Sequence, residues 1–211
     1  MAAERDNERS VLVRADLSAV ADLVAGRVIG TLAQLTEERA TVHIALTGGR
    51  GGAAVLSAIA AHPWRDNINW ARVHLWWSDE RFVPAADPER NEVLARAALI
   101  DSIDIPARNV HAISASDAGV DVDAAADAYA NELAGFAPVG GDPWPSFDIT
   151  LLGVGPDGHY ASLFPERPEI NVTDRTALAV RDSPKPPPNV TSAGWRRASR
   201  PPSSSTPRRR T

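Results

Sequence analysis

His159 is the residue of this chain whose setting best suits acid–base chemistry. It ends a glycine-rich turn, residues 153–159, that follows a short apolar run. Apolar runs that stop at glycine and proline are typical of buried parallel strands, and open α/β sheets bind ligands beyond the carboxyl ends of such strands. An imidazole with a reference pKa of about 6.5 suits general base catalysis near neutral pH. Because Ser162 lacks the Gly-x-Ser-x-Gly motif of a nucleophile elbow, we expect His159 to activate water.

A second group of reactive side chains, Asp79, Glu80 and Arg81, follows the very apolar run at residues 73–77. The planar guanidinium of Arg81 could neutralise a phosphate or a developing oxyanion. Asp79 or Glu80 could orient that guanidinium. The alternative is a solvated cluster of charges on a surface loop, with no role in chemistry.

A third segment, Thr47-Gly48-Gly49-Arg50-Gly51-Gly52, joins an expected strand to an expected helix. Glycines allow backbone N–H groups to approach an anion closely, and a helix N-terminus attracts negative charge. The segment is therefore a candidate phosphate-binding loop. An ordinary tight turn between a strand and a helix has the same composition.

Secondary-structure elements must hold these segments in place, and the hydrophobic periodicity of the sequence predicts strands that alternate with helices. Helices are expected at 16–38, 53–61, 91–99 and 122–133, and strands at 41–46, 73–77, 110–113, 147–152 and 177–180. The other histidines lie within or beside these elements, where a packed imidazole is the ordinary case: His43, His62, His74 and His111. The alternation predicts an α/β fold with a doubly wound, mainly parallel, Rossmann-like sheet.

Parallel strands in one sheet end on the same edge, so the polar segments that follow them should meet there. We expect four loops to converge on this edge, at residues 47–52, 78–84, 153–159 and 181–185. The last of these loops contains Lys185. Their convergence would place a base, an arginine, a glycine-rich loop and a lysine around one site.

Composition narrows the class of protein. The chain has 211 residues, 44% of them hydrophobic, which suits one globular domain. It contains no cysteine, which excludes disulfides, a thiolate nucleophile and a cysteine-based metal site. The charged N-terminus has no apolar signal region, and no apolar stretch approaches the roughly 20 residues of a membrane span. We therefore expect a cytoplasmic protein with no membrane partner. The sequence does not decide the oligomeric state, for which we favour a monomer.

The net charge of −5 is unevenly distributed. Residues 181–211 hold eight Lys or Arg and one acidic residue, whereas residues 1–180 hold fourteen basic and twenty-six acidic residues. Residues 189–211 are rich in Pro, Ser and Arg and have no apolar periodicity, so we expect them to form a disordered basic tail. One alternative reading of the whole chain is a non-catalytic protein whose basic tail binds nucleic acid.

Four segments, LTGGRGG, WWSDERFVPAADPERN, LLGVGPDGHYASLFPE and VRDSPKPPP, occur in an order and at spacings that resemble the 6-phosphogluconolactonases. These enzymes are related to the glucosamine-6-phosphate deaminases. The resemblance implies hydrolysis of 6-phospho-D-glucono-1,5-lactone without a metal or an organic cofactor. It makes His159 the base that activates water and places Arg81 at the lactone carbonyl. It implies further that the phosphate is bound by Thr47, Gly48, Gly49 and Lys185, with Asp79, Glu80 and Asp157 as supporting residues.

The resemblance covers the chain up to about Pro188 and then stops. The family has a phosphate-binding arginine after the proline run, followed by further strands and helices, whereas this chain continues with Asn189. We interpret residues 1–188 as an incomplete lactonase-like domain, and our hypothesis for the change is a frameshift near codon 189. On this interpretation the 211-residue chain should have little or no activity. The closest functional alternative is a deaminase or isomerase of amino-sugar phosphates.

Overall fold

A computed structural model of the protein describes residues 10–184 and 188–192. Its helices are α1 (Leu17–Glu38), α2 (Gly49–Ala61), α3 (Asn91–Ala98) and α4 (Val122–Gly135). Its strands are β1 (Val42–Leu46), β2 (Val73–Trp77), β3 (Asp79–Arg81), β4 (Val110–His111), β5 (Ile149–Thr150), β6 (Ala177–Val180) and β7 (Asn189–Ser192). Short 3₁₀ turns lie at Arg65–Asn67, Trp70–Arg72, Ile100–Ser102, Ala107–Asn109 and Pro168–Asn171.

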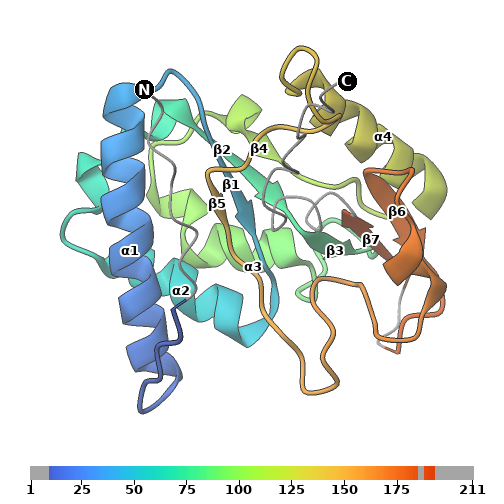
Figure 1. The fold of residues 1–211 in the computed structure, drawn as a ribbon, viewed down its shortest axis with the longest axis horizontal. Coiled ribbons are helices and arrows are strands. Elements are labelled where there is room, and N and C mark those ends of the chain that lie inside the picture. Colours follow the sequence, from blue (N-terminus) through green and yellow to red (C-terminus); the bar gives the residue numbers. More distant parts are fainter. Residues whose placement is uncertain (1–9, 185–187, 193–211) are drawn as a thin grey trace, which may run out of the picture.

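The central sheet is parallel, with the strand order β4-β2-β1-β5. On one side of it α1 packs against α2, and α2 against α3. Helix α4 lies on the opposite side from α1 (Figure 1). The hydroxyl of Tyr129 on α4 accepts the N–H of Trp77 and donates to its carbonyl, both at 2.9 Å. Helices on both faces of a parallel sheet confirm the expected doubly wound α/β fold.

Helix α1 shows why an amphipathic sequence can also resemble a membrane span. Its side chains bury a stripe that includes Ala25, Ile29 and Leu32, and the Asp16 carboxylate caps its N-terminus by accepting the Ala19 N–H at 2.9 Å. By length and composition alone, α1 is also apolar enough to cross a membrane. The expectation that no stretch approaches a membrane span is therefore wrong for α1. Buried core helices pass the same test, and α1 packs against α2.

A second, antiparallel sheet with the order β3-β7-β6 corrects two expectations. The strand at 177–180 exists, but it does not belong to the parallel sheet. The disordered tail does not begin at residue 189, because residues 189–192 form β7, the middle strand of this sheet, and Val190 is completely buried. The burial of Val190 anchors a segment whose composition is otherwise polar. The rest of the expected tail, residues 193–211, lies outside the described residues.

Candidate active site

Three of the four expected loops meet at one cleft of about 890 Å³. The glycine segment after β1, strand β3 and the loop after β5 each contribute to its lining. The fourth loop does not, as far as it is described: Arg181 follows β6 in the other sheet and forms an ion pair with Asp123 at the start of α4. Lys185 lies outside the described residues. The prediction of a shared edge therefore failed for the strand that belongs to a different sheet.

His159 lines the cleft with its side chain mostly buried, at 12% exposure. Its Nδ1 hydrogen-bonds the Asp157 carboxylate, and this bond lowers the pKa of Asp157. Its ring packs against Phe164 with centroids 4.7 Å apart. A carboxylate bonded to Nδ1 orients the ring and places the proton on that nitrogen. In the neutral ring this tautomer has no proton on Nε2, which is the form a general base requires.

The loop backbone explains why glycines surround this histidine. A Cβ on Gly155 would lie 2.1 Å from Cε1 of His159, so no larger residue fits beside the ring. Gly158 has a φ of +84°, in the left-handed region that favours glycine. Ala161, which also lines the cleft, has a φ of +49°, uncommon for a residue with a side chain. Backbone conformations of this kind cluster at functional sites.

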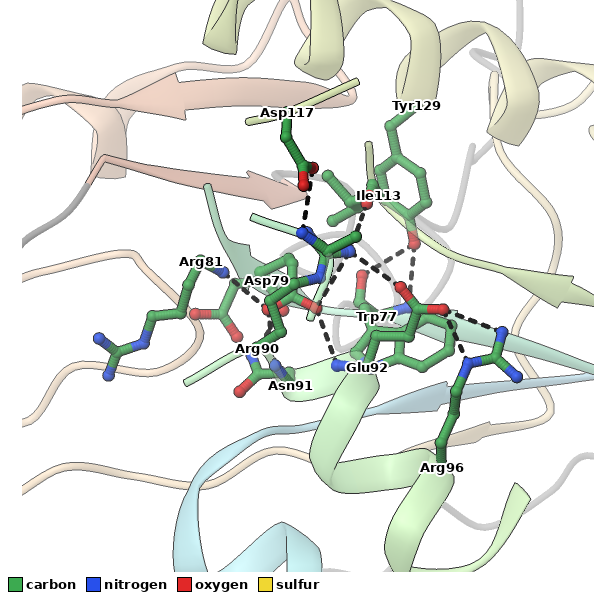
Figure 2. Close-up of polar contacts among 12 residues, drawn as sticks. Trp77, Asp79, Arg81, Arg90, Asn91, Glu92, Arg96, Ile113, Asp117 and Tyr129 are labelled. Atoms are coloured by element: carbon green, nitrogen blue, oxygen red, sulfur yellow. Dashed lines mark hydrogen bonds and ion pairs between the residues drawn. The ribbon is translucent and has the colours of Figure 1, made fainter. Parts of the chain in front are cut away.

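Arg81 reaches the cleft from β3, a strand that sequence reasoning placed in a loop. Its backbone pairs with Asn189 of β7, and its Nη1 lies 3.1 Å from the Glu89 carboxylate. Figure 2 shows its guanidinium pointing away from the ion-paired side chains of Arg90, Glu92 and Arg96. Arg81 therefore belongs to the cleft and not to the network of ion pairs beside it.

Asp79 and Glu80, both expected to support Arg81, have different surroundings. Asp79 lines the cleft, where its carboxylate accepts a hydrogen bond of 2.7 Å from the Ser162 hydroxyl. Burial raises the pKa of Asp79, against the opposing effects of Ser162 and Arg81. Glu80 is 1% exposed and lies beneath the cleft, where it accepts the Arg81 N–H at 2.8 Å. Burial raises the pKa of Glu80 to about 7.

Two residues of this group were missed or misassigned from the sequence. The Ser162 hydroxyl accepts a 3.0 Å hydrogen bond from the Asn189 side chain while it donates to Asp79. Asn189 was assigned to the tail, and Ser162 was considered only as a nucleophile. The roles of these two residues depend on the antiparallel sheet, because Ser162 hydrogen-bonds Asp79 of β3 and Asn189 of β7.

The glycine segment forms the first turn of α2 rather than a loop before it. Gly48 is the N-cap, no side chain caps this end, and no acidic residue occupies the first turn. Gly49 has a φ of +73°, and Thr47 Oγ1 accepts the Gly153 N–H at 3.3 Å. An uncapped helix N-terminus leaves backbone N–H groups available to an anion. Thr47, Gly48 and Gly49 all line the cleft, as expected of a phosphate-binding segment.

Arg50 also lines the cleft and was not singled out from the sequence. It is exposed, and within residues 10–184 and 188–192 no acidic side chain pairs with it. Its position in the first turn of α2 adds a positive charge where the helix dipole already favours anions. The same described part of the chain holds no group of three or more His, Cys, Asp or Glu that could bind a metal ion.

The chain is similar in sequence to proteins of one known family. The family model described as glucosamine-6-phosphate isomerases/6-phosphogluconolactonase matches residues 15–196. The 6-phosphogluconolactonase of Streptomyces coelicolor is 49% identical over 181 residues, which cover 84% of this chain and 69% of that protein. The Mycobacterium tuberculosis 6-phosphogluconolactonase is 48% identical over 164 residues, or 77% of this chain and 65% of that protein. The chain thus spans about two thirds of the length of these two relatives.

Solved structures show the same fold. The crystal structure of 6-phosphogluconolactonase from Thermotoga maritima superposes with a TM-score of 0.69 at 29% identity, covering 82% of this chain and 72% of that one. The enzyme from Trypanosoma cruzi superposes with a TM-score of 0.72 at 25% identity, covering 88% of this chain and 74% of that one.

Proposed function

This chain belongs to the glucosamine-6-phosphate isomerase/6-phosphogluconolactonase family, and from that membership we propose that it hydrolyses 6-phospho-D-glucono-1,5-lactone to 6-phosphogluconate in the oxidative pentose phosphate pathway. The observation that carries the proposal is the His159–Asp157 pair in the cleft that also contains Arg81. A base, a cation for the oxyanion and an uncapped helix N-terminus for a phosphate are the groups that this hydrolysis needs.

In the proposed reaction, Nε2 of His159 removes a proton from water as the water oxygen attacks C1 of the lactone. The carbonyl oxygen becomes an oxyanion, which the Arg81 guanidinium stabilises. When the intermediate collapses, the bond between C1 and the ring oxygen breaks, and the imidazolium returns its proton to that oxygen. The Asp157 carboxylate holds the ring in place and stabilises the imidazolium while it exists. One water is consumed, and the product is an open-chain acid.

The 6-phosphate would bind at the N-terminus of α2, to the backbone N–H groups after Gly48 and to the hydroxyl of Thr47. Arg50 would add a positive charge from the same helical turn. Lys185, which is outside the described residues, is a further proposed cation. Local positive charge of this kind is required because the chain as a whole is acidic.

The expectation of little or no activity rested on the missing phosphate-binding arginine after Pro188 and on the missing further strands and helices of the family. Strand β7 instead pairs with β3, and Asn189 hydrogen-bonds Ser162 at the cleft. We therefore propose that the 211-residue chain turns over the lactone. We further propose that it acts in the cytoplasm as a monomer on this small molecule, without a nucleic-acid or membrane partner.

The test is the rate of lactone hydrolysis by the purified 211-residue chain, measured as the excess over spontaneous hydrolysis. The His159→Ala variant should lose about 10²–10⁴ in kcat, which is the usual contribution of a general base. A wild-type protein with no excess rate would contradict the proposal. Release of ammonia from glucosamine 6-phosphate would favour the isomerase and deaminase branch of the family instead.

A further inference from the structure

The side chain of Asn91 connects two walls of the cleft. Asn91 is the first residue of α3, is 8% exposed and lines the cleft. Its Nδ2 donates a 2.8 Å hydrogen bond to the carbonyl of Asp79 on β3. Its Oδ1 lies so close to Gly48 that a Cβ on that glycine would be only 1.8 Å away. One amide group therefore fills the space between β3 and the N-cap of α2.

Asn91 is itself held from beneath the cleft. Oε1 of Glu80 accepts the Asn91 N–H at 2.7 Å and the Arg81 N–H at 2.8 Å, so a single oxygen joins the two backbones. Oε2 accepts the Glu92 N–H at 2.8 Å. Arg90, which is 1% exposed, places Nη2 at 3.8 Å from the same carboxylate. A carboxylate that accepts backbone N–H groups at a helix N-terminus fixes that helix as a cap does.

These contacts set the separation between the two ends of the proposed substrate. The phosphate would bind at the Gly48 end and the lactone carbonyl would face Arg81, and Asn91 lies between them. Binding energy from a remote group such as a phosphate accelerates a reaction only if it places the reacting atoms correctly. An error of about 1 Å in that placement can cost about 10²-fold in rate.

We propose that Asn91, held by Glu80, is a positioning residue that fixes the distance between the anion site at Gly48 and the guanidinium of Arg81, and so makes turnover depend on the substrate's phosphate. The proposal rests on the function proposed above. It goes further by assigning substrate discrimination to an amide that need not contact the reacting carbonyl. A residue with this role should affect phosphorylated and unphosphorylated lactones differently.

The test compares kcat/KM for 6-phosphoglucono-1,5-lactone and for glucono-1,5-lactone, each corrected for spontaneous hydrolysis. Asn91→Ala should lower the ratio of the two values by about 10- to 100-fold, because the phosphate no longer aligns the carbonyl with Arg81. The matched control is Asn109→Ala. Asn109 is also a buried asparagine that donates to two backbone carbonyls, of Ala71 and Val73, but it does not line the cleft. Its loss should leave the ratio unchanged.

A merely structural role would lower both rates in proportion to the folded fraction and would not move the ratio. Asn91→Asp keeps the volume against Gly48 but loses the Nδ2 donor, so it tests the hydrogen bond if the alanine variant folds poorly. Glu80→Gln should lower the same ratio of kcat/KM values. In the double variant with Asn91→Ala it should lower the ratio little further, because Glu80 acts on the ratio by holding Asn91.

An unchanged ratio in folded Asn91→Ala and Asn91→Asp proteins would overturn this inference while leaving the lactonase proposal intact. A wild-type protein with no excess rate on either lactone would overturn the lactonase proposal itself.

Discussion

Gly48 and Gly51 lie three residues apart in the same glycine segment, and the structure predicts opposite effects for the same substitution at each. A Cβ on Gly48 would lie 1.8 Å from Oδ1 and 2.2 Å from Cγ of Asn91. The backbone of Gly48 has a φ of −83°, which any residue can adopt, so the cost must come from this collision. Forcing a group into a packed site costs about 1–3 kcal/mol of folding free energy. A Cβ on Gly51 meets nothing within 4 Å and should stabilise α2 by about 0.5–1 kcal/mol.

Urea denaturation of Gly48→Ala, Gly51→Ala and the wild-type protein measures both effects. The two variants should differ by about 1.5–4 kcal/mol in the free energy of unfolding. Combining Gly48→Ala with Asn91→Ala removes the collision, so the double variant should be more stable than the sum of the single effects predicts. Equal stabilities for the two glycine variants, or additive effects in the double variant, would refute the close contact between Gly48 and Asn91.

Two half-buried histidines should make the stability of the fold depend on pH. Burial, followed by neighbouring charges, lowers the pKa values of His43 and His74 to about 4, so the unfolded chain binds more protons than the folded one between about pH 4 and 6.5. Stability from these groups is complete above pH 6.5 and is lost as the pH falls through 4. Because both rings are partly exposed, we expect about 1–2 kcal/mol from each. The pKa of Glu80 is raised, so this group changes stability with pH in the opposite direction. The measurement is therefore the difference in the free energy of unfolding between wild type and His74→Asn, because Glu80 contributes equally to both proteins. This difference should shrink by about 1–2 kcal/mol between pH 7.5 and pH 4.5. A difference independent of pH would contradict the assignment. Separately, Arg81→Lys should lower kcat for the phosphorylated lactone, because an ammonium does not reproduce the planar guanidinium; full activity in that variant would show that Arg81 is only a surface charge.

The spacing of hydrophobic residues predicted the helices and strands whose own apolar side chains form the buried face. Helix α1 lies where its apolar spacing and the Asp16 cap indicated. The parallel strands β1 and β2 were also predicted, because each is an apolar run that is buried in the sheet. Strand β7 could not be found in this way, because Asn189, Thr191 and Ser192 are polar and are buried by hydrogen bonds from neighbouring strands. Its burial depends on partners that lie far away in the sequence.

In the candidate site, too, local sequence identified some residues, whereas the roles of others depend on contacts with distant parts of the chain. Local glycine spacing led to Gly48 and His159, because a turn's sequence carries its own conformational requirement. The glycine segment was expected as a loop, but it forms the first turn of α2, since its residues continue the helical hydrogen bonding. The roles of Asn91, Ser162 and Asn189 arise from contacts between β3, α3 and β7, and no local pattern encodes such contacts.

The proposed hydrolysis depends on the activation of water by His159, which Asp157 orients in this cleft. The most direct test is the kcat for 6-phosphoglucono-1,5-lactone of the wild-type 211-residue chain and of His159→Ala, with KM determined for each and spontaneous hydrolysis subtracted. We expect a clear excess rate for the wild type, a kcat lowered by about 10²–10⁴ in the variant, and little change in KM. An excess rate in His159→Ala equal to that of the wild type would contradict this expectation.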